Sequence, residues 1–270
     1  MTKELKLFAT DMDGTFLRSD RAYNRDKLAI VLEQFDQLGW IFCASSGRQL
    51  LALEELFDGF TDKMAFVAEN GGVVSYKNQM ISAQTFSTSQ IDSIIDLLRR
   101  MPFSPDSDFL ISGLKGAYSI KGVSDWFFDK AQLYYANCQI VNSLDEIDDT
   151  LLKITTNFPE DKTRECESFI TEELPYVRAT TTGFTSIDII PDGISKASGL
   201  NALVNHFGWT ADNLAAFGDQ MNDYEMLEYA GTSYAVSNAT KEILTLADNI
   251  IGSNDEDAVF TEIERIISGK

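Results

Sequence analysis

The segment LFATDMDGTFLRSD (residues 7–20) places two aspartates, Asp11 and Asp13, directly after a short apolar run. The run from Leu5 to Ala9 is typical of a central parallel strand that is buried on both faces. Asp11 and Asp13 therefore follow the carboxyl end of this strand, which is the end that faces the ligand crevice in open α/β sheets. Because like charges held this close need a cation or a shared proton, we expect either a functional site or a strained turn here.

Strand and helix patterns alternate after this segment. Residues 23–40 have apolar side chains at helical spacing, and residues 47–60 read as a second helix. Apolar runs at 40–45 and 64–70 read as the second and third strands. Such alternation predicts a doubly wound parallel sheet with helices on both faces.

The alternation of strands and helices stops after Asn70 and resumes near Ile194. The chain between them mixes a hairpin, alternating strands and further helices, which is α+β character. We therefore predict an α/β fold with a doubly wound, Rossmann-like parallel-sheet core, formed by residues 1–82 and 186–270. An α+β cap domain, residues 83–185, is inserted between the two halves.

Composition excludes several classes of protein. The formal net charge of −20 argues against a nucleic-acid partner, because such binding relies on clustered lysine and arginine. Cys43, Cys138 and Cys166 lack metal-ligand spacing and suit a reducing compartment better than a disulfide framework. No apolar run approaches the roughly 20 residues of a membrane span, so we expect a cytoplasmic protein that has no membrane partner.

Three more polar segments lie where strands of the predicted core end or where helices begin: Ser46–Gly47, Lys196, and GDQMND at 218–223. Each alone has an ordinary reading, as a helix start, a surface lysine or a helix cap. A hydroxyl followed by a glycine amide at a helix start also makes an anion site. Because all of these segments fall at one edge of one sheet, in order along the core, we interpret them together as a site.

The motifs DMDGTFL, SSGR, ENGG, ISKASGL and GDQMND resemble those of the haloacid dehalogenase superfamily, and the last two look like its Cof-like phosphatase branch. Asp13 and Ser46 are 33 positions apart, whereas Ser46 and Lys196 are 150 apart, so the insertion must follow the third strand. In this family that position implies a large cap of the second type (C2). One departure is mild, since Ser46 stands where many relatives have threonine.

The resemblance implies a phosphatase that works through an aspartyl-phosphate. Asp11 would be the nucleophile, and Asp13 would be the general acid and base. The cofactor would be Mg²⁺, held by the Asp11 carboxylate, the Asp13 backbone carbonyl and the Asp219 carboxylate, because Mg²⁺ prefers an octahedral shell of oxygen ligands. A bound metal and phosphate would explain why the two carboxylates of the opening segment lie so close together.

The remaining residues would act on the phosphoryl group. Lys196 would neutralise the nucleophile and the phosphoryl oxygens, while Ser46 and the Gly47 amide would donate to the transferring group. Asn222 matches the phosphate-contacting asparagine of the family. Asp223 would orient Lys196 or a metal-bound water.

We predict that the protein hydrolyses a small phosphorylated metabolite, a sugar phosphate or a similar phosphomonoester. A phosphomutase or phosphotransferase could use identical residues, and added acceptor sugars would separate these alternatives. A catalytically idle phosphate-binding protein is disfavoured because Asp11 and Asp13 are both present. Since every phosphate-directed motif lies in the core, the inserted segment is predicted to select the leaving group. The oligomeric state is left open.

Overall fold

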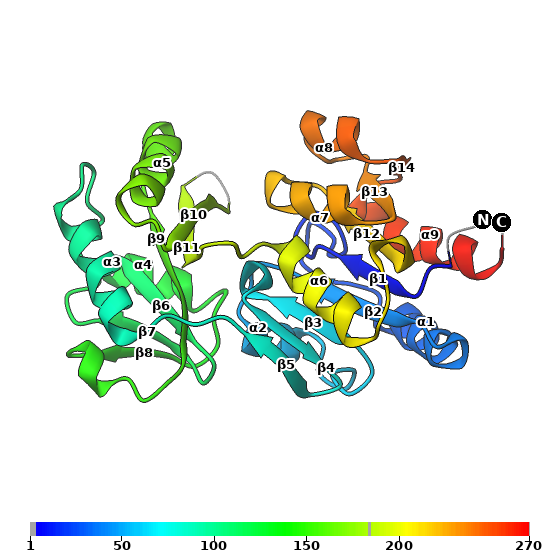
Figure 1. Cartoon of the computed structure of the whole chain (residues 1–270), viewed down its shortest axis with the longest axis horizontal. Coiled ribbons are helices and arrows are strands. Elements are labelled where there is room, and N and C mark those ends of the chain that lie inside the picture. The colour runs from blue at the N-terminus through cyan, green and yellow to red at the C-terminus, as the bar shows by residue number, and fades with distance from the viewer. Residues whose placement is uncertain (1–3, 183–184, 270) are drawn as a thin grey trace. The chain divides into compact units, whose positions relative to one another are not determined.

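The computed structural model describes residues 4–182 and 185–269. Two compact units are formed (Figure 1). The first contains the described residues of Met1–Ser46, Phe57–Ser82 and Ser195–Lys270, and the second contains those of Gly47–Leu56 and Ala83–Ile194. Within residues 4–182 and 185–269, no helix is both long enough and apolar enough to cross a membrane.

The first unit is built on an eight-stranded sheet in the order β14-β13-β12-β1-β2-β3-β4-β5. The strands from β14 to β3 are parallel, while β4 pairs antiparallel with β3. The strands are β1 (Leu7–Thr10), β2 (Ile41–Ser45), β3 (Ala65–Ala68), β4 (Val73–Tyr76), β5 (Gln79–Ala83), β12 (Leu214–Gly218), β13 (Thr232–Val236) and β14 (Asn249–Ile251).

Helices cover both faces of this sheet because its central strands carry apolar side chains on both faces. Leu7 and Ala9 belong to a cluster with buried residues of α6 (Lys196–His206), α7 (Tyr224–Tyr229) and α8 (Lys241–Leu246). Phe8 points to the opposite face, where its ring lies 4.8 Å from that of Phe35. Phe35 belongs to α1 (Arg25–Leu38), which packs beside α9 (Ala258–Ile267) (Figure 1). The predicted doubly wound α/β class is confirmed.

The second unit contains a six-stranded sheet in the order β10-β11-β9-β6-β7-β8. Its pairs are antiparallel except for β7 with β8, which accounts for the α+β character. The strands are β6 (Phe109–Gly113), β7 (Ala117–Ile120), β8 (Cys138–Val141), β9 (Leu151–Asn157), β10 (Val177–Thr181) and β11 (Ser186–Pro191). The helices are α2 (Leu50–Leu56), α3 (Thr88–Arg100), α4 (Asp125–Ala131) and α5 (Thr163–Glu173).

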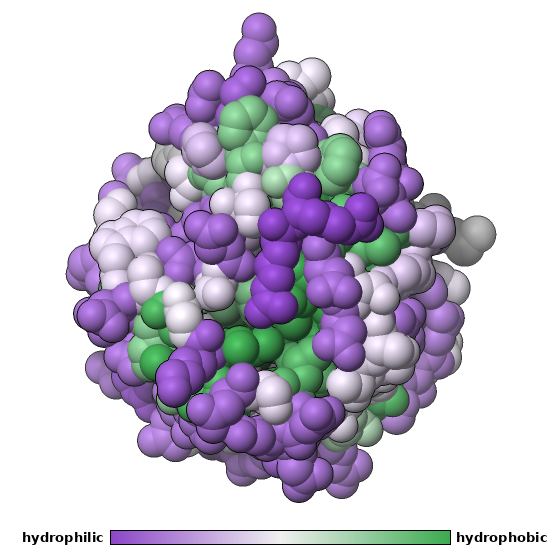
Figure 2. Space-filling model, turned by 90° about the vertical axis from the view of Figure 1, so that its left-hand side faces the viewer, coloured by the Kyte–Doolittle hydropathy of each residue, from purple (hydrophilic) through white to green (hydrophobic). Residues whose placement is uncertain are grey.

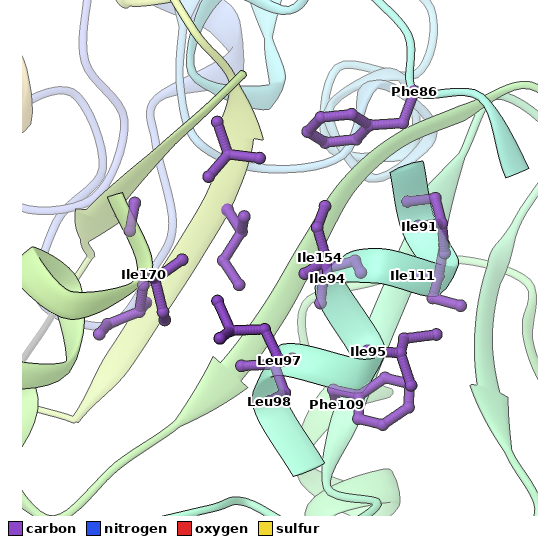
Figure 3. Packing of buried hydrophobic residues seen from close by; sticks show 14 of the residues in the cluster. Phe86, Ile91, Ile94, Ile95, Leu97, Leu98, Phe109, Ile111, Ile154 and Ile170 are labelled. Atoms are coloured by element: carbon purple, nitrogen blue, oxygen red, sulfur yellow. The ribbon is translucent and has the colours of Figure 1, made fainter. Parts of the chain in front are cut away.

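One face of the second sheet carries the main apolar core of this unit. Figure 3 shows Ile91, Ile94 and Leu98 of α3 pointing toward the strands, where Phe109 and Ile154 meet them. Helix α3 begins at a capping box, in which the Ser87 and Gln90 side chains satisfy each other's backbone amides. The face of the molecule shown in Figure 2 is mostly hydrophilic around its rim, with apolar residues gathered near its centre and top. This surface agrees with the acidic composition of the chain.

Candidate active site

Asp11 follows β1 and forms an ion pair with the first residue of α6. Lys196 Nζ donates to Asp11 Oδ1 at 2.5 Å and to Asp223 Oδ1 at 2.6 Å. All three side chains are at least nine-tenths buried. Ser195 caps α6 through a capping box with Ser198, and this fixes the position of Lys196 at the start of the helix. The structure therefore brings three of the predicted site residues into direct contact.

Asp223 also shapes the turn that follows β12. Its Oδ2 accepts from the backbone amides of Asp219 at 2.9 Å and Gln220 at 3.1 Å. A Cβ atom at Gly218 would lie only 2.6 Å from Asp223 Cβ, so this close approach requires glycine. Asp223 thus holds Lys196 with one oxygen and the Asp219 loop with the other.

Asp219 is oriented by the loop after β1. Thr15 Oγ1 donates to Asp219 Oδ1 at 2.9 Å. Gly14 has φ +85°, and a Cβ there would lie 2.6 Å from Asp219 Oδ2, so a side chain at Gly14 would displace this carboxylate. Asn238 Nδ2 donates to the Gly14 carbonyl at 2.8 Å, which ties this turn to the segment after β13.

Asp11, Asp219 and Asp223 form an acidic cluster in which one oxygen of each lies within 4.8 Å of the others. Burial, followed by repulsion from Asp223, raises the pKa of Asp11 well above its ordinary value. The same causes raise the pKa of Asp219 to about 6. Burial alone would lower the pKa of Lys196, but the charges of Asp11 and Asp223 outweigh it and raise that pKa.

One lysine cannot balance the three carboxylates of the acidic cluster, so their full ionisation requires another cation. Hard oxygen donors of this kind suit Mg²⁺ or Ca²⁺ better than softer metals. The donor set therefore fits the divalent cation expected from the sequence. Lys196 bridges Asp11 to Asp223, and Asp219 is the third carboxylate of the cluster.

The other predicted residues lie at the same sheet edge or are tied to it by the chain. Ser46 follows β2, which pairs parallel with β1, and it is buried. Its backbone amide donates to Val67 O at 2.8 Å, and its carbonyl accepts from Asn70 N at 3.0 Å. Gly47 is the next residue in the chain, but it belongs to the second unit.

Asp13 and Asn222 are more accessible than the acidic cluster. Asp13 is exposed and stands outside the cluster formed by the described residues. Asn222 is half-buried in the 3₁₀ turn Met221–Asp223, directly before Asp223, which accepts a hydrogen bond from Lys196. An exposed carboxyl two residues after the buried Asp11 can exchange protons with solvent.

Sequence reasoning did not find Asn238 as a supporting residue. It follows β13 in the short stretch SNAT, where an asparagine has the ordinary meaning of a turn residue. Its role depends on contacts from two distant segments, because Asn238 Oδ1 also accepts from Asn254 N at 3.1 Å. Only the tertiary structure brings these segments together.

Two glycines set the position of α6. Gly71 has φ +103°, and a Cβ there would lie 1.9 Å from Ser195 O. A Cβ at Gly199 would lie 2.6 Å from Val67 Cγ1 and 2.9 Å from Gly71 Cα. The first turn of α6, which carries Lys196, therefore rests directly on the backbone after β3.

We expect Gly199→Ala to destabilise the fold by about 1–3 kcal/mol, as overpacking of a filled core does. The displaced helix turn should also reduce turnover, since Lys196 lies one turn earlier. Chemical denaturation measures the first effect and steady-state kinetics the second. Asn205→Ala is the control, because this residue lies exposed on α6; its free energy of unfolding should change by less than about 0.5 kcal/mol. Equal stability of the two variants would contradict the packing argument.

A model of the haloacid dehalogenase-like hydrolases matches residues 8–263, so the chain belongs to this family. The Escherichia coli (strain K12) protein YbjI, a 5-amino-6-(5-phospho-D-ribitylamino)uracil phosphatase, is 31% identical over 265 residues, which cover 97% of this chain and 96% of YbjI. YcsE of Bacillus subtilis (strain 168), named for the same activity, is 26% identical over 262 residues, covering 96% of this chain and 95% of YcsE.

The crystal structure of SMU.1108c from Streptococcus mutans UA159 superposes with a TM-score of 0.91 at 32% identity, and the match covers 98% of this chain and 100% of that chain. These comparisons confirm the family and the fold class predicted from the sequence. They also confirm the enzyme class, since the chain is a phosphatase of the haloacid dehalogenase type.

Proposed function

We propose that this phosphatase depends on Mg²⁺ and hydrolyses small phosphorylated metabolites through a phosphoaspartate on Asp11. The observation that carries the proposal is the buried contact of Lys196 with Asp11 and Asp223, beside Asp219, at the carboxyl end of parallel strands. An ionisable cluster that burial perturbs this strongly is typical of a catalytic site. The predicted roles of the individual residues remain part of this proposal.

The metal would be held by the carboxylates of Asp11 and Asp219 and by the backbone carbonyl of Asp13. When bound, Mg²⁺ would neutralise charge on the phosphoryl oxygens and orient the substrate. Thr15 supports this arrangement because its hydroxyl holds Asp219 Oδ1. Asp223 is committed to Lys196 and to two backbone amides, so its proposed role is to orient those groups.

In the first step, an Asp11 carboxylate oxygen attacks phosphorus in line while the bond from phosphorus to the leaving oxygen breaks. Asp13 donates its proton to that oxygen, so the product leaves as a neutral alcohol. Lys196 already donates to Asp11 Oδ1 and would stabilise the charge that spreads onto the phosphoryl oxygens. Ser46 Oγ, the Gly47 amide and Asn222 would donate to the same oxygens.

In the second step, the Asp13 carboxylate takes a proton from water, and the resulting hydroxide attacks phosphorus. The bond between phosphorus and Asp11 breaks, which releases inorganic phosphate and restores the Asp11 carboxylate. Asp13 is protonated again and ready for the next substrate. Its exposure supports this double role, because solvent must reach the attacking position.

The first candidate substrate comes from the relatives. YbjI and YcsE are both named for 5-amino-6-(5-phospho-D-ribitylamino)uracil, and each aligns with nearly the whole chain. This compound is a phosphomonoester of a polyhydroxylated alcohol, so it falls within the class predicted from the sequence. We therefore propose it as the first compound to test.

The test is a panel of phosphometabolites that includes this compound, ribitol 5-phosphate and p-nitrophenyl phosphate, assayed for released phosphate with and without Mg²⁺. We expect equal amounts of phosphate and alcohol, and no turnover after chelation. The assay is repeated with added acceptor sugars. Transfer of the phosphoryl group to a sugar in place of water would show a phosphotransferase, and absence of release from every ester would refute the proposal.

The pKa values predict a pH dependence for the metal. Since the pKa of Asp219 is raised to about 6, and that of Asp11 is raised too, the metal-free fold retains protons that Mg²⁺ must displace. These raised values favour the metal-free fold at low pH, and that contribution is lost as pH rises through about 6. Mg²⁺ should therefore raise the melting temperature clearly at pH 8 and hardly at pH 5.

Calorimetry at both pH values measures this difference, with KCl at matched ionic strength as the control. We expect a shift of several degrees at pH 8 with saturating Mg²⁺, as binding to the native state alone produces. A shift of the same size at pH 5 would show that the cation does not compete with these protons.

A further inference from the structure

Ser45, the first serine of the SSGR motif, carries a buried hydroxyl that the proposed reaction does not use. It is the last residue of β2 and is completely buried. Its Oγ has no hydrogen-bond partner among the described residues. A buried hydroxyl without a partner loses its bonds to water and gains none in return, so it destabilises the fold. Such a group in a native structure calls for an explanation, and a catalytic site beside it provides one.

The register of the core sheet places Ser45 beside Asp11. Strands β1 and β2 are parallel, and their last paired residues are Thr10 and Ala44. The next residues along the two strands are therefore Asp11 and Ser45. Neighbouring strands lie about 4.8 Å apart, so a serine hydroxyl and a carboxylate on the same face can reach each other across this gap.

Both side chains point to the face of the sheet that α6 covers (Figure 1). Ala9 and Cys43, earlier in the two strands, enter the apolar cluster that is shared with α6. Since side chains alternate along a strand, Asp11 and Ser45 take the same direction. The bond from Lys196 to Asp11 agrees with this direction, because Lys196 is the first residue of α6. Ser45 therefore lies next to the ion pair of Asp11 with Lys196.

The neighbours on the other side of Ser45 contact the same part of α6. Ser45 pairs with Val67 of β3. A Cβ at Gly199 would lie 2.6 Å from Val67 Cγ1, so the helix turn that begins at Lys196 packs directly on this strand. Bulk water does not reach the Ser45 hydroxyl in this packing. The polar group that the helix turn brings to this position is the ion pair.

Asp11 can accept a second hydrogen bond. Lys196 Nζ donates to its Oδ1, whereas an ionised carboxylate has about four acceptor sites on its two oxygens. In-line attack requires one orientation of this carboxylate, and a lysine acts on it as a point charge at the end of a flexible side chain. A second donor from β2 would fix the plane of the carboxylate as well. Serine can supply it by changing a single side-chain torsion.

Resting on the proposed function, we infer that Ser45 is a positioning residue, whose hydroxyl donates to the Asp11 carboxylate and holds it in the orientation for attack on phosphorus. The bond forms when the carboxylate is ionised and turned toward the metal and the phosphoryl group, because a charged acceptor binds a donor most strongly. The hydroxyl thus destabilises the resting fold slightly and stabilises the reacting one.

The first test is Ser45→Ala, assayed with p-nitrophenyl phosphate in saturating Mg²⁺. We expect kcat to fall by more than about tenfold, as loss of a group that supports a metal ligand does. KM should stay close to the wild-type value, because the lost bond belongs to the reacting state. The metal-free variant should melt no lower than the wild type, since alanine removes an unpartnered hydroxyl from a buried position. Loss of a merely structural residue would not lower kcat while leaving stability unharmed.

Ser75→Ala is the matched control. Ser75 is a buried serine of β4, and within the described part of the chain its Oγ likewise has no hydrogen-bond partner. It pairs with Phe66 in the middle of the antiparallel β3–β4 pair, away from the carboxyl end of β1. The same deletion at this position should leave kcat unchanged and the melting temperature no lower than that of the wild type.

Two further variants separate the hydroxyl from the size of the side chain. Ser45→Thr keeps the hydroxyl and should restore most of the kcat that Ser45→Ala loses. Ser45→Cys keeps the shape of serine but offers a weaker donor, so its kcat should lie between those of the wild type and Ser45→Ala. Cys43 on the same face of β2 shows that this row of side chains accepts a thiol, so the cysteine variant decides the question if the threonine methyl prevents folding.

Wild-type kcat in folded Ser45→Ala would overturn the inference. So would a lower melting temperature that accompanies the loss of activity, or an equal loss in all three Ser45 variants, because either result would make the residue structural. Asp11→Asn distinguishes these results from failure of the proposed function. If Asp11→Asn remains active, the proposed nucleophile is wrong and the inference fails with it. If Asp11→Asn is inactive while Ser45→Ala works normally, the inference alone fails.

Discussion

Asp11→Asn is expected to lower turnover at least about 1,000-fold, which corresponds to a loss of roughly 4 kcal/mol of transition-state stabilisation. The substitution removes the charge of the proposed nucleophile and one proposed ligand of the metal, so the proposed phosphoaspartate cannot form. Steady-state release of phosphate in saturating Mg²⁺ measures this loss. Residual turnover within a factor of ten of the wild type would remove Asp11 from the role of nucleophile.

The same substitution should leave the fold intact. Burial and the charge of Asp223 raise the pKa of Asp11, so the folded protein already disfavours the ionised form that Asn replaces. Lys196 keeps its bond to Asp223 in the variant. The metal-free variant should therefore melt no lower than the wild type, which separates a chemical defect from a folding defect.

Beryllium fluoride gives a second readout, because it mimics a phosphoryl group on a carboxylate. With Mg²⁺ it should bind the wild type and not Asp11→Asn. Asp26→Asn makes the same chemical change in the exposed first turn of α1 and serves as the control. Binding of beryllium fluoride to Asp11→Asn would place the nucleophile elsewhere.

The core could be predicted because its residues carry local signals. Leu7 and Phe8 are apolar in succession, as a strand covered on both faces requires, and the structure buries both completely. Asp11, Lys196 and Asp219 each adjoin a strand end or a helix start, so the topology alone brings them to one edge. Period and position were sufficient to predict these features.

The second unit was harder to predict because its strands do not follow one pattern. Residues 109–113 and 186–191 form β6 and β11, central strands that the sequence pattern did not indicate, as it did not indicate β14. Lys153 and Asp188 interrupt the apolar alternation of their strands, and a lysine in a strand normally indicates a solvated face. Their burial depends on cross-strand pairing that single-strand patterns do not contain.

Asp13 and Asp219 should respond differently to Mg²⁺ although both are carboxylates at one edge of the sheet. Asp219→Ala removes a proposed direct ligand, which Thr15 holds in place. Loss of groups that merely support a ligand costs 10–100-fold in metal affinity, so loss of the ligand itself should raise the Mg²⁺ concentration for half-maximal activity more than about 100-fold. Titration of phosphate release against Mg²⁺ measures this shift.

Asp13→Asn is the matched comparison because its backbone carbonyl, the proposed ligand, is unchanged. Loss of a general acid and base should lower kcat by about 10²–10⁴-fold while the Mg²⁺ titration keeps its midpoint. The defect should be smaller for p-nitrophenyl phosphate than for ribitol 5-phosphate, because nitrophenolate leaves without a proton and only the second step still needs Asp13. Coincident Mg²⁺ midpoints for Asp13→Asn and Asp219→Ala would show that the two carboxylates share one role. In that case the exposed position of Asp13 and the buried position of Asp219 would not reflect a division of chemistry.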